Sequence, residues 1–176
     1  MSLSWVSNSD LRSAVNSGTP FFIKNAIPGI AITWEDIIKN VNYCSESSSK
    51  VTFMKGTFIT NKVLSKRLED IAQPFRAAIR ETYPGSSNYT SHVYTSIVSD
   101  AETFGRHKDT ADVFFLGILG KTSFDIWNKQ DKVVHYIVEV GDVIYIPCGL
   151  YHNPTAMTPR SGISFGIERG KYIHGV

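Results

Sequence analysis

Hydrophobic positions in the first part of the chain follow helical spacing and then change to an extended run. Leu11 and Val15 lie one helical turn apart, directly after a sequence at residues 7–10 that resembles a capping box. Gly18 comes just after this short periodic segment and is typical of a helix end. The apolar run that follows predicts a strand over residues 21–24.

Two further helices are predicted before the middle of the chain. The second helix begins at residues 33–36, and its apolar side carries Trp34, Ile37, Ile38 and Val41. A polar loop at residues 45–49 and a short strand at residues 51–54 follow. Apolar residues then recur at helical spacing from Leu64 to Ile79, but Pro74 interrupts them, which predicts a kink or two consecutive helices. A turn is predicted at residues 84–88.

From Tyr89 onward the pattern changes to short β-strands separated by turn residues. Phe124 and Ile126 alternate around Asp125, and the segment 162–167 alternates in the same way. Several short antiparallel strands that close on themselves suit a jelly-roll or cupin architecture, although periodicity alone also allows a β-sandwich. We therefore expect a mainly β domain over residues 1–176, with the helices of its N-terminal part lying against the sheets.

Composition narrows the classes of protein that fit this pattern. The net charge is only +2, from 18 Lys and Arg against 16 Asp and Glu, which argues against a dominant nucleic-acid or membrane-surface role. No apolar run approaches membrane-spanning length, and the N-terminus lacks a signal-peptide pattern. Cys44 and Cys148 form no C-x-x-C motif, so no disulfide framework is expected. The expectation is a soluble, intracellular, cytoplasmic protein, and the oligomeric state is left open.

Candidate chemistry centres on His107 and Asp109, which lie two residues apart before a long apolar run. Residues i and i+2 of a strand face the same side, so one imidazole and one carboxylate can point at one spot. Asp112 has the wrong parity to replace Asp109. His152 can supply a third ligand from a later strand, which would complete the two-histidine, one-carboxylate triad of non-heme Fe(II) oxygenases. For the H-x-D pair alone, a structural histidine bonded to a loop carboxylate is the ordinary explanation.

The surrounding sequence is more specific than the pair itself. Gly-Lys follows the apolar run at residues 120–121, and residues 141–152 read Gly-Asp-Val-Ile-Tyr-Ile-Pro-Cys-Gly-Leu-Tyr-His. Together with His107 and Asp109, these segments resemble the JmjC and cupin-like branch of the Fe(II)/2-oxoglutarate oxygenases. Residues 19–25, followed by Trp34, are also similar to the first strand and helix of that family. The resemblance therefore spans nearly the whole chain.

The resemblance implies a fold, two cofactors and a reaction. The fold is a double-stranded β-helix with N-terminal flanking helices, and the triad sits inside its mouth. His107, Asp109 and His152 would be the metal ligands and the catalytic residues. Fe(II) and 2-oxoglutarate would be the cofactors of a dioxygenase that forms succinate and carbon dioxide and hydroxylates a prime substrate. That substrate would be a protein side chain or a small molecule.

The chain departs from the family pattern where the far carboxylate of 2-oxoglutarate is held. The usual lysine position falls on Thr122, and lysine is found one place earlier, at Lys121. Either a bulge brings Lys121 inward, or Thr122 acts with another group. Arg160, just before the last strand, and Tyr94, on the strand before the triad, are the further candidates. The ordinary interpretation of Lys121 and of Arg160 is a solvated side chain at the surface.

Two other functions fit the same residues. One is a metal-dependent cupin enzyme that does not use 2-oxoglutarate, which the missing lysine at position 122 favours. The other is a non-catalytic cupin-like binding module. Anaerobic titration with Fe(II), with and without 2-oxoglutarate, would separate the dioxygenase from the other cupin enzyme. Formation of succinate, abolished by Asp109→Ala, would eliminate the binding module.

Overall fold

The computed structural model describes residues 9–47, 49–82 and 89–168, which contain three helices and ten strands. The helices precede most of the strands, as the sequence predicts. In chain order the elements are α1 (Ser9–Ser17), β1 (Phe21–Ile23), α2 (Trp34–Glu46), β2 (Val51–Met54), β3 (Thr57–Thr60), α3 (Lys66–Thr82), β4 (Tyr89–Ser96), β5 (Asp112–Leu119), β6 (Thr122–Trp127), β7 (Val133–Val138), β8 (Val143–Ile146), β9 (His152–Ala156) and β10 (Arg160–Ile167).

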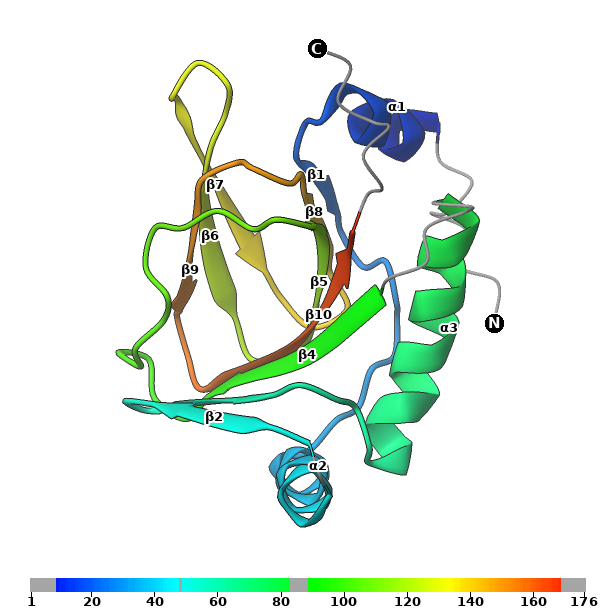
Figure 1. Cartoon of the computed structure of the whole chain (residues 1–176), viewed down its shortest axis with the longest axis vertical. Helices are drawn as coiled ribbons and strands as arrows, with labels where there is room; N and C mark the ends of the chain where they lie inside the picture. Colours follow the sequence, from blue (N-terminus) through cyan, green and yellow to red (C-terminus); the bar gives the residue numbers. More distant parts are fainter. Residues whose placement is uncertain (1–8, 48, 83–88, 169–176) are drawn as a thin grey trace.

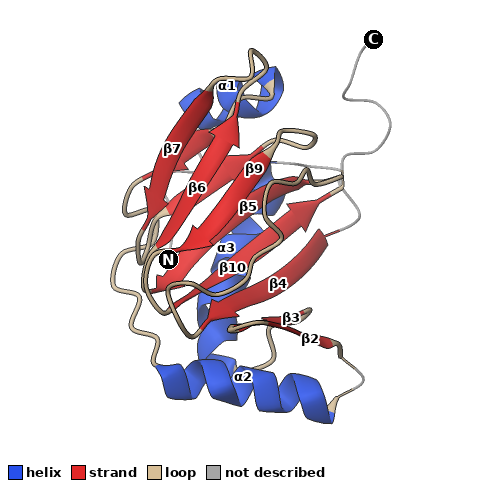
Figure 2. Ribbon diagram, turned by 90° about the vertical axis from the view of Figure 1, so that its left-hand side faces the viewer, coloured by secondary structure: helices blue, strands red, loops and turns tan. Residues whose placement is uncertain are grey.

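The strands form two antiparallel sheets that face each other (Figure 1). The larger sheet has seven strands in the order β1-β8-β5-β10-β4-β3-β2, and the smaller has three in the order β7-β6-β9. Helices α1 and α3 lie on the side of the large sheet that faces away from the small one (Figure 1). Helix α2 lies at one end of the molecule, beside β2 and β3 (Figure 2). The predicted mainly β fold with N-terminal flanking helices is confirmed.

Two apolar cores lie on opposite faces of the large sheet. The first is formed between the sheet and the helices, and its members include Leu11, Leu68, Phe75, Phe114, Ile163 and Phe165. The second fills the space between the two sheets with Phe115, Phe124, Ile126, Val138, Ile144 and Ile146. Alternation along each strand supplies both cores at once, because successive side chains point to opposite faces.

Helix α2 corrects one sequence-based prediction. Its N-terminus is capped by Thr33, as expected, and its Ile37 is fully buried. Trp34 and Ile38, however, are 38% and 46% exposed, and the buried side is completed by Asn40 and Cys44. The amide of Asn40 accepts hydrogen bonds from two backbone N–H groups, those of residues 64 and 65, which compensates for its burial.

The structure differs from the sequence-based predictions at two other places, and two further predictions concern residues outside the described ranges. The periodic segment around Pro74 is one helix, α3, so the option of two consecutive helices was wrong. Strand β3 was not predicted, although it pairs with β2 along its whole length. The capping residues at positions 7 and 8 and the turn at 84–88 lie outside the described residues. Within the described part of the chain, no helix has the length and apolar character needed to cross a bilayer.

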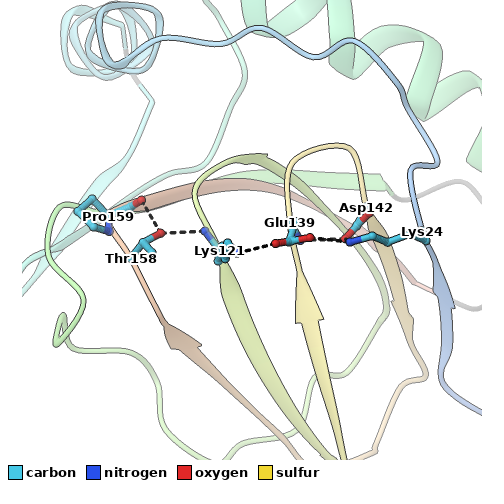
Figure 3. A network of polar contacts seen from close by, with 6 residues as sticks. All are labelled: Lys24, Lys121, Glu139, Asp142, Thr158 and Pro159. Atoms are coloured by element: carbon cyan, nitrogen blue, oxygen red, sulfur yellow. Dashed lines mark hydrogen bonds and ion pairs between the residues drawn. The ribbon is translucent and has the colours of Figure 1, made fainter.

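A chain of ion pairs ties together three turns at one end of the sheets (Figure 3). Glu139 binds Lys121 at 2.7 Å and Lys24 at 2.6 Å, and Lys24 also reaches the buried Asp142 at 3.1 Å. The hydroxyl of Thr158 accepts a hydrogen bond from the backbone N–H of Lys121. Paired with two ammonium groups, Glu139 has its pKa lowered to about 2.

Candidate metal centre and its cavity

Two strand-like segments bring the H-x-D pair and the distant histidine together. His107 and Asp109 lie on the connection between β4 and β5, and His152 is the first residue of β9. The backbones of His107 and His152 form an isolated antiparallel bridge, with N–H···O distances of 3.0 and 2.9 Å. In addition, the carbonyl of Asp109 accepts a hydrogen bond from the N–H of Gly149 at 3.0 Å. The Pro-Cys-Gly turn before His152 thus holds the H-x-D segment as well.

The three side chains converge on one point. The Nε2 atom of His107 lies 3.8 Å from one oxygen of Asp109, and Nε2 of His152 lies 3.4 Å from the other. One potential ligand atom from each of the three residues lies within 4.8 Å of the other two. His152 is almost fully buried, whereas His107 and Asp109 are partly exposed. Such a cluster can hold a divalent metal on one side and leave its other coordination positions open.

Backbone carbonyls orient both imidazoles for this role. Nδ1 of His107 lies 2.8 Å from the carbonyl oxygen of Gly105, and Nδ1 of His152 lies 3.2 Å from that of Leu150. A carbonyl can only accept, so each Nδ1 carries the proton and donates it. Each Nε2 then presents its lone pair to the centre of the cluster. Such outer hydrogen bonds fix both the tautomer and the ring orientation of metal-binding histidines.

The carboxylate of Asp109 is kept charged by its neighbours. Burial, the strongest single influence, raises its pKa. When no metal holds the imidazoles and they are protonated, the hydrogen bond donated by His152 and the positive charges of His152, His107 and His92 together outweigh burial and lower the pKa. Asp112 has a different task, as its parity indicates. Its carboxylate accepts hydrogen bonds from the hydroxyl of Tyr145 at 3.1 Å and from the backbone N–H of Cys148 at 2.7 Å.

The triad opens into a cavity between the two sheets. Phe115, Phe124, Val113 and Ile146 give it apolar walls, and the triad contributes all three of its side chains. Tyr94 and Arg160 also line this cavity. The structure therefore brings these two candidates for co-substrate binding into the same space as the metal ligands.

Arg160 is an unusual residue because its guanidinium is buried and one of its nitrogens finds no hydrogen-bond acceptor among the described residues. The side chain is 2% exposed, and its Nε has no hydrogen-bond acceptor among residues 9–47, 49–82 and 89–168. Burial lowers the pKa of Arg160 to about 10, against a smaller opposing influence of Tyr94. Burial likewise raises the pKa of Tyr94 to about 12, and the charge of Asp109 adds to this while that of Arg160 opposes it. A buried guanidinium is costly unless an anion pairs with it.

The other two candidates lie elsewhere. Lys121 is about half exposed and pairs with Glu139 (Figure 3). It is not among the residues that line the cavity, so no bulge turns its ammonium group inward. Strand alternation explains the direction of Lys121, because neighbours point to opposite faces. Thr122 shares the buried face of β6 with Phe124, but it is not among the residues that line the cavity. Of the four candidates for co-substrate binding, only Tyr94 and Arg160 thus face the metal ligands across one cavity.

Sequence reasoning missed several residues that line the cavity, among them Phe104 and Ser164. Phe104 lies on the segment before the triad, and its ring packs 5.6 Å from that of His107 and 6.3 Å from that of Tyr94, measured between centroids. Ser164 lines the cavity from β10, four residues after Arg160. Its parity with Arg160 was a usable signal, whereas nothing in the local sequence marks Phe104.

Known structures share this arrangement of strands. A structure of YcfD, a ribosomal oxygenase from Escherichia coli, in complex with cobalt and 2-oxoglutarate matches with a TM-score of 0.67 at 18% sequence identity. The match covers 87% of this chain and 49% of that one. A second YcfD structure, with cobalt and succinic acid, matches over 88% of this chain with the same TM-score. The chain has the JmjC/cupin-type fold.

A further structural match has the same type of fold, whereas the sequence comparisons give no match. A structure of oxalate decarboxylase matches this JmjC/cupin-type chain with a TM-score of 0.50 at 17% identity, over 69% of this chain and 28% of that one. No protein-family model matches the sequence, and no curated protein matches it. The chain spans about half the length of the YcfD structures. The resemblance inferred from the sequence is thus confirmed for the fold.

Proposed function

We propose that this JmjC/cupin-type chain is an Fe(II)- and 2-oxoglutarate-dependent dioxygenase that hydroxylates its substrate. The observation that carries the proposal is that one cavity holds both a two-histidine, one-carboxylate cluster and a buried arginine whose Nε has no hydrogen-bond acceptor among the described residues. The cluster suits a divalent metal, and the arginine suits an anionic ligand. The YcfD structure that contains cobalt and 2-oxoglutarate supports the same pair of ligands.

His107, Asp109 and His152 would hold Fe(II). The donor set fits this ion, because two imidazole nitrogens and one carboxylate on one side are typical of non-heme Fe(II) oxygenases. When bound, Fe(II) with 2-oxoglutarate and oxygen supplies the oxidation, in which 2-oxoglutarate becomes succinate and carbon dioxide and the substrate gains a hydroxyl group. The chain itself keeps both imidazoles in the ligating tautomer through the carbonyls of Gly105 and Leu150.

Arg160 and Tyr94 would bind the far carboxylate of 2-oxoglutarate. A guanidinium can donate two parallel hydrogen bonds to a carboxylate, and its buried Nε has no other acceptor in the described part of the chain. The phenol of Tyr94 keeps its proton at neutral pH, because its pKa is about 12, so its hydroxyl can donate as well. In this chain the pair would do the work of the lysine that position 122 lacks.

The walls of the cavity would exclude water from the reacting groups. Phe115, Phe124, Val113 and Ile146 offer no hydrogen bonds from their side chains, so the few polar groups decide how a ligand is oriented. Phe104 would limit access from the open side, where it packs on His107. Substrate and co-substrate would therefore meet in an apolar space with the polar groups at defined positions.

A protein side chain or a small molecule is the proposed prime substrate. The protein alternative draws support from the YcfD structures, which are described as those of a ribosomal oxygenase. We also propose that residues 1–176 act as one domain in the cytoplasm, since the composition is globular and the net charge is small.

An anaerobic titration tests the central proposal. Fe(II) added to metal-free protein with 2-oxoglutarate should give a metal-to-ligand charge-transfer absorption band that is absent with Fe(II) alone. In air, the protein should then convert 2-oxoglutarate to succinate, and Asp109→Ala should abolish both signals. Arg80→Ala is a suitable control, because Arg80 lies on the exposed side of α3 and contacts Tyr89 instead of the cavity.

The same titration separates the alternatives. Metal binding that is indifferent to 2-oxoglutarate would support a cupin enzyme of another kind and would refute the dioxygenase. A protein that binds ligands but forms no succinate with any substrate, and keeps that behaviour in His107→Ala, would be a binding module. A charge-transfer band that survives in Arg160→Ala with unchanged affinity would remove Arg160 from the proposed co-substrate site.

A further inference from the structure

We propose that Arg106 is a positioning residue for the metal centre. Its guanidinium lies against two aromatic rings on the outer side of the small sheet, and this double contact, called the clamp below, fixes the segment that carries His107 and Asp109. The inference rests on the proposed function only in requiring that the triad bind a divalent metal.

The segment needs such an anchor because it has little regular structure of its own. Residues 97–111 join β4 to β5 and contain no strand, and their one β-bridge is the pair formed by His107 with His152. Two of the three proposed ligands therefore depend on a connection about fifteen residues long. On the inner side the connection is held by that bridge and by the hydrogen bond from Gly149 to the Asp109 carbonyl.

On the outer side, two residues flank His107, namely Arg106 and Lys108. Of these, only Arg106 contacts more than one aromatic ring. Its Cζ lies 4.3 Å from the ring centroid of Trp127 and 4.5 Å from that of Tyr151. Its Nη2 also pairs with a carboxylate oxygen of Asp131 at 3.2 Å. Both rings are within the range of a favourable cation–aromatic contact.

The two rings form a platform that is itself well anchored. Trp127 is the last residue of β6, and Tyr151 directly precedes β9. The backbone N–H of Trp127 donates to the carbonyl of Tyr151 at 2.9 Å, so the platform continues the pairing of these two strands. Arg106 thus attaches the connection to the sheet that also carries His152.

Because side chains alternate in direction along an extended segment, the position of Arg106 sets the direction of the neighbouring metal ligands. Consecutive residues of an extended segment point to opposite sides, so a fixed outward Arg106 places His107 inward. Lys108 also points outward and lies 4.2 Å from the ring centroid of Tyr151, but it contacts one ring where Arg106 contacts two. Of the two residues beside His107, Arg106 is therefore the one whose loss should loosen the connection more.

The size of the expected effect follows from the contacts. A metal that requires the docked connection binds with an affinity reduced by the fraction of molecules that are docked. Each exposed cation–aromatic contact favours docking by a factor of about two to five, so loss of both should weaken metal binding by up to about 4- to 25-fold. The absorption spectrum of the saturated centre should not change, since its three ligands are all still present.

A Co(II) titration of metal-free protein, followed by visible absorption, tests the proposal. We expect Arg106→Ala to weaken Co(II) binding by up to about 4- to 25-fold at an almost unchanged thermal midpoint. Arg106→Gln keeps a planar group that can stack on the rings and should recover part of the loss. Arg80→Ala is the matched control, because Arg80 of α3 makes the same kind of contact, with its Cζ 5.1 Å from the ring centroid of Tyr89. The Arg80→Ala variant should bind Co(II) as the parent does.

Three results would overturn the inference. Co(II) affinity of Arg106→Ala equal to that of the parent would show that the clamp does not position the ligands. Equal losses in Arg106→Ala and Arg80→Ala would indicate general destabilisation. Parent-like Co(II) binding in His107→Ala would show that the triad is not the metal site and would refute the proposed function. If His107→Ala abolishes Co(II) binding but Arg106→Ala has no effect, only the clamp is refuted.

Discussion

Replacement of Arg160 by methionine should make the ligand-free protein more stable and abolish its response to 2-oxoglutarate. The guanidinium is 2% exposed, and its Nε has no acceptor in the described residues, so the folded protein carries the cost of a buried charge. Methionine has a similar length and no charge, and its thioether adapts to an apolar cavity. Stability and ligand binding should therefore change in opposite directions.

The magnitude follows from the effect of burial on the guanidinium. Burial, less the smaller opposing influence of Tyr94, lowers the pKa of Arg160 from 12.5 to about 10, a difference of about 2.5. At about 1.4 kcal/mol for each pKa step of one, the buried charge costs of the order of 3 kcal/mol. For a chain of this size, 1 kcal/mol moves the melting temperature by about 2–4 °C. We expect Arg160→Met to melt about 6–12 °C above the parent without ligands.

Thermal unfolding with and without ligands checks this reasoning. Co(II) with 2-oxoglutarate at 100 times its dissociation constant should stabilise the parent by about 2.7 kcal/mol, and Arg160→Met should gain only the part due to metal. The exposed Arg80→Met should behave as the parent in both conditions. A lower melting temperature of ligand-free Arg160→Met, together with an undiminished shift on adding 2-oxoglutarate, would refute the reasoning.

Three further predictions concern the cavity, the core and the surface network. A Cβ at Gly162 would lie 2.0 Å from the ring of Phe115, so Gly162→Ala should push this ring into the cavity, cost about 1–3 kcal/mol in denaturant unfolding and weaken 2-oxoglutarate binding; unchanged binding would contradict this. Asn40→Ala should lower the free energy of unfolding by about 3 kcal/mol, because it leaves buried N–H groups without acceptors, and a loss below 1 kcal/mol would count against the role of the amide. The pKa of Glu139 is lowered from 4.5 to about 2, so its ion pairs stabilise the fold above about pH 4.5 and lose this effect as the pH falls toward 2. The melting temperature of Glu139→Gln should therefore approach that of the parent over this pH range, and a constant gap would exclude the network as its source.

The alternating direction of side chains along strands made much of the β half predictable from the sequence, including the cluster of two histidines and one aspartate. The i and i+2 rule placed His107 and Asp109 on one side and assigned Asp112 to the other, where it binds Tyr145. The turn before His152 was recognisable from its glycine and proline residues. Both inferences use only neighbours in the chain, for which the physical rules are short-range and strong.

Features that depend on distant partners were not predictable in this way. The burial of Asn40 breaks the apolar pattern of α2, because its amide serves the backbone of a segment more than twenty residues away. The burial of Arg160 depends on two neighbouring strands, and an arginine at a strand start is ordinarily a surface residue. The outward direction of Lys121 followed from parity, but its partner Glu139 belongs to another turn.

Strand β10 divides its residues between two tasks. Ile163, Phe165 and Ile167 belong to the core beneath the helices, whereas Arg160 and Ser164 border the cavity. A combinatorial library restricted to the second set should thus yield folded variants with altered ligand preference, since it leaves the contacts with the helices intact. Ligand preference and heat resistance could then be selected independently on one strand, because alternate residues of β10 determine each property.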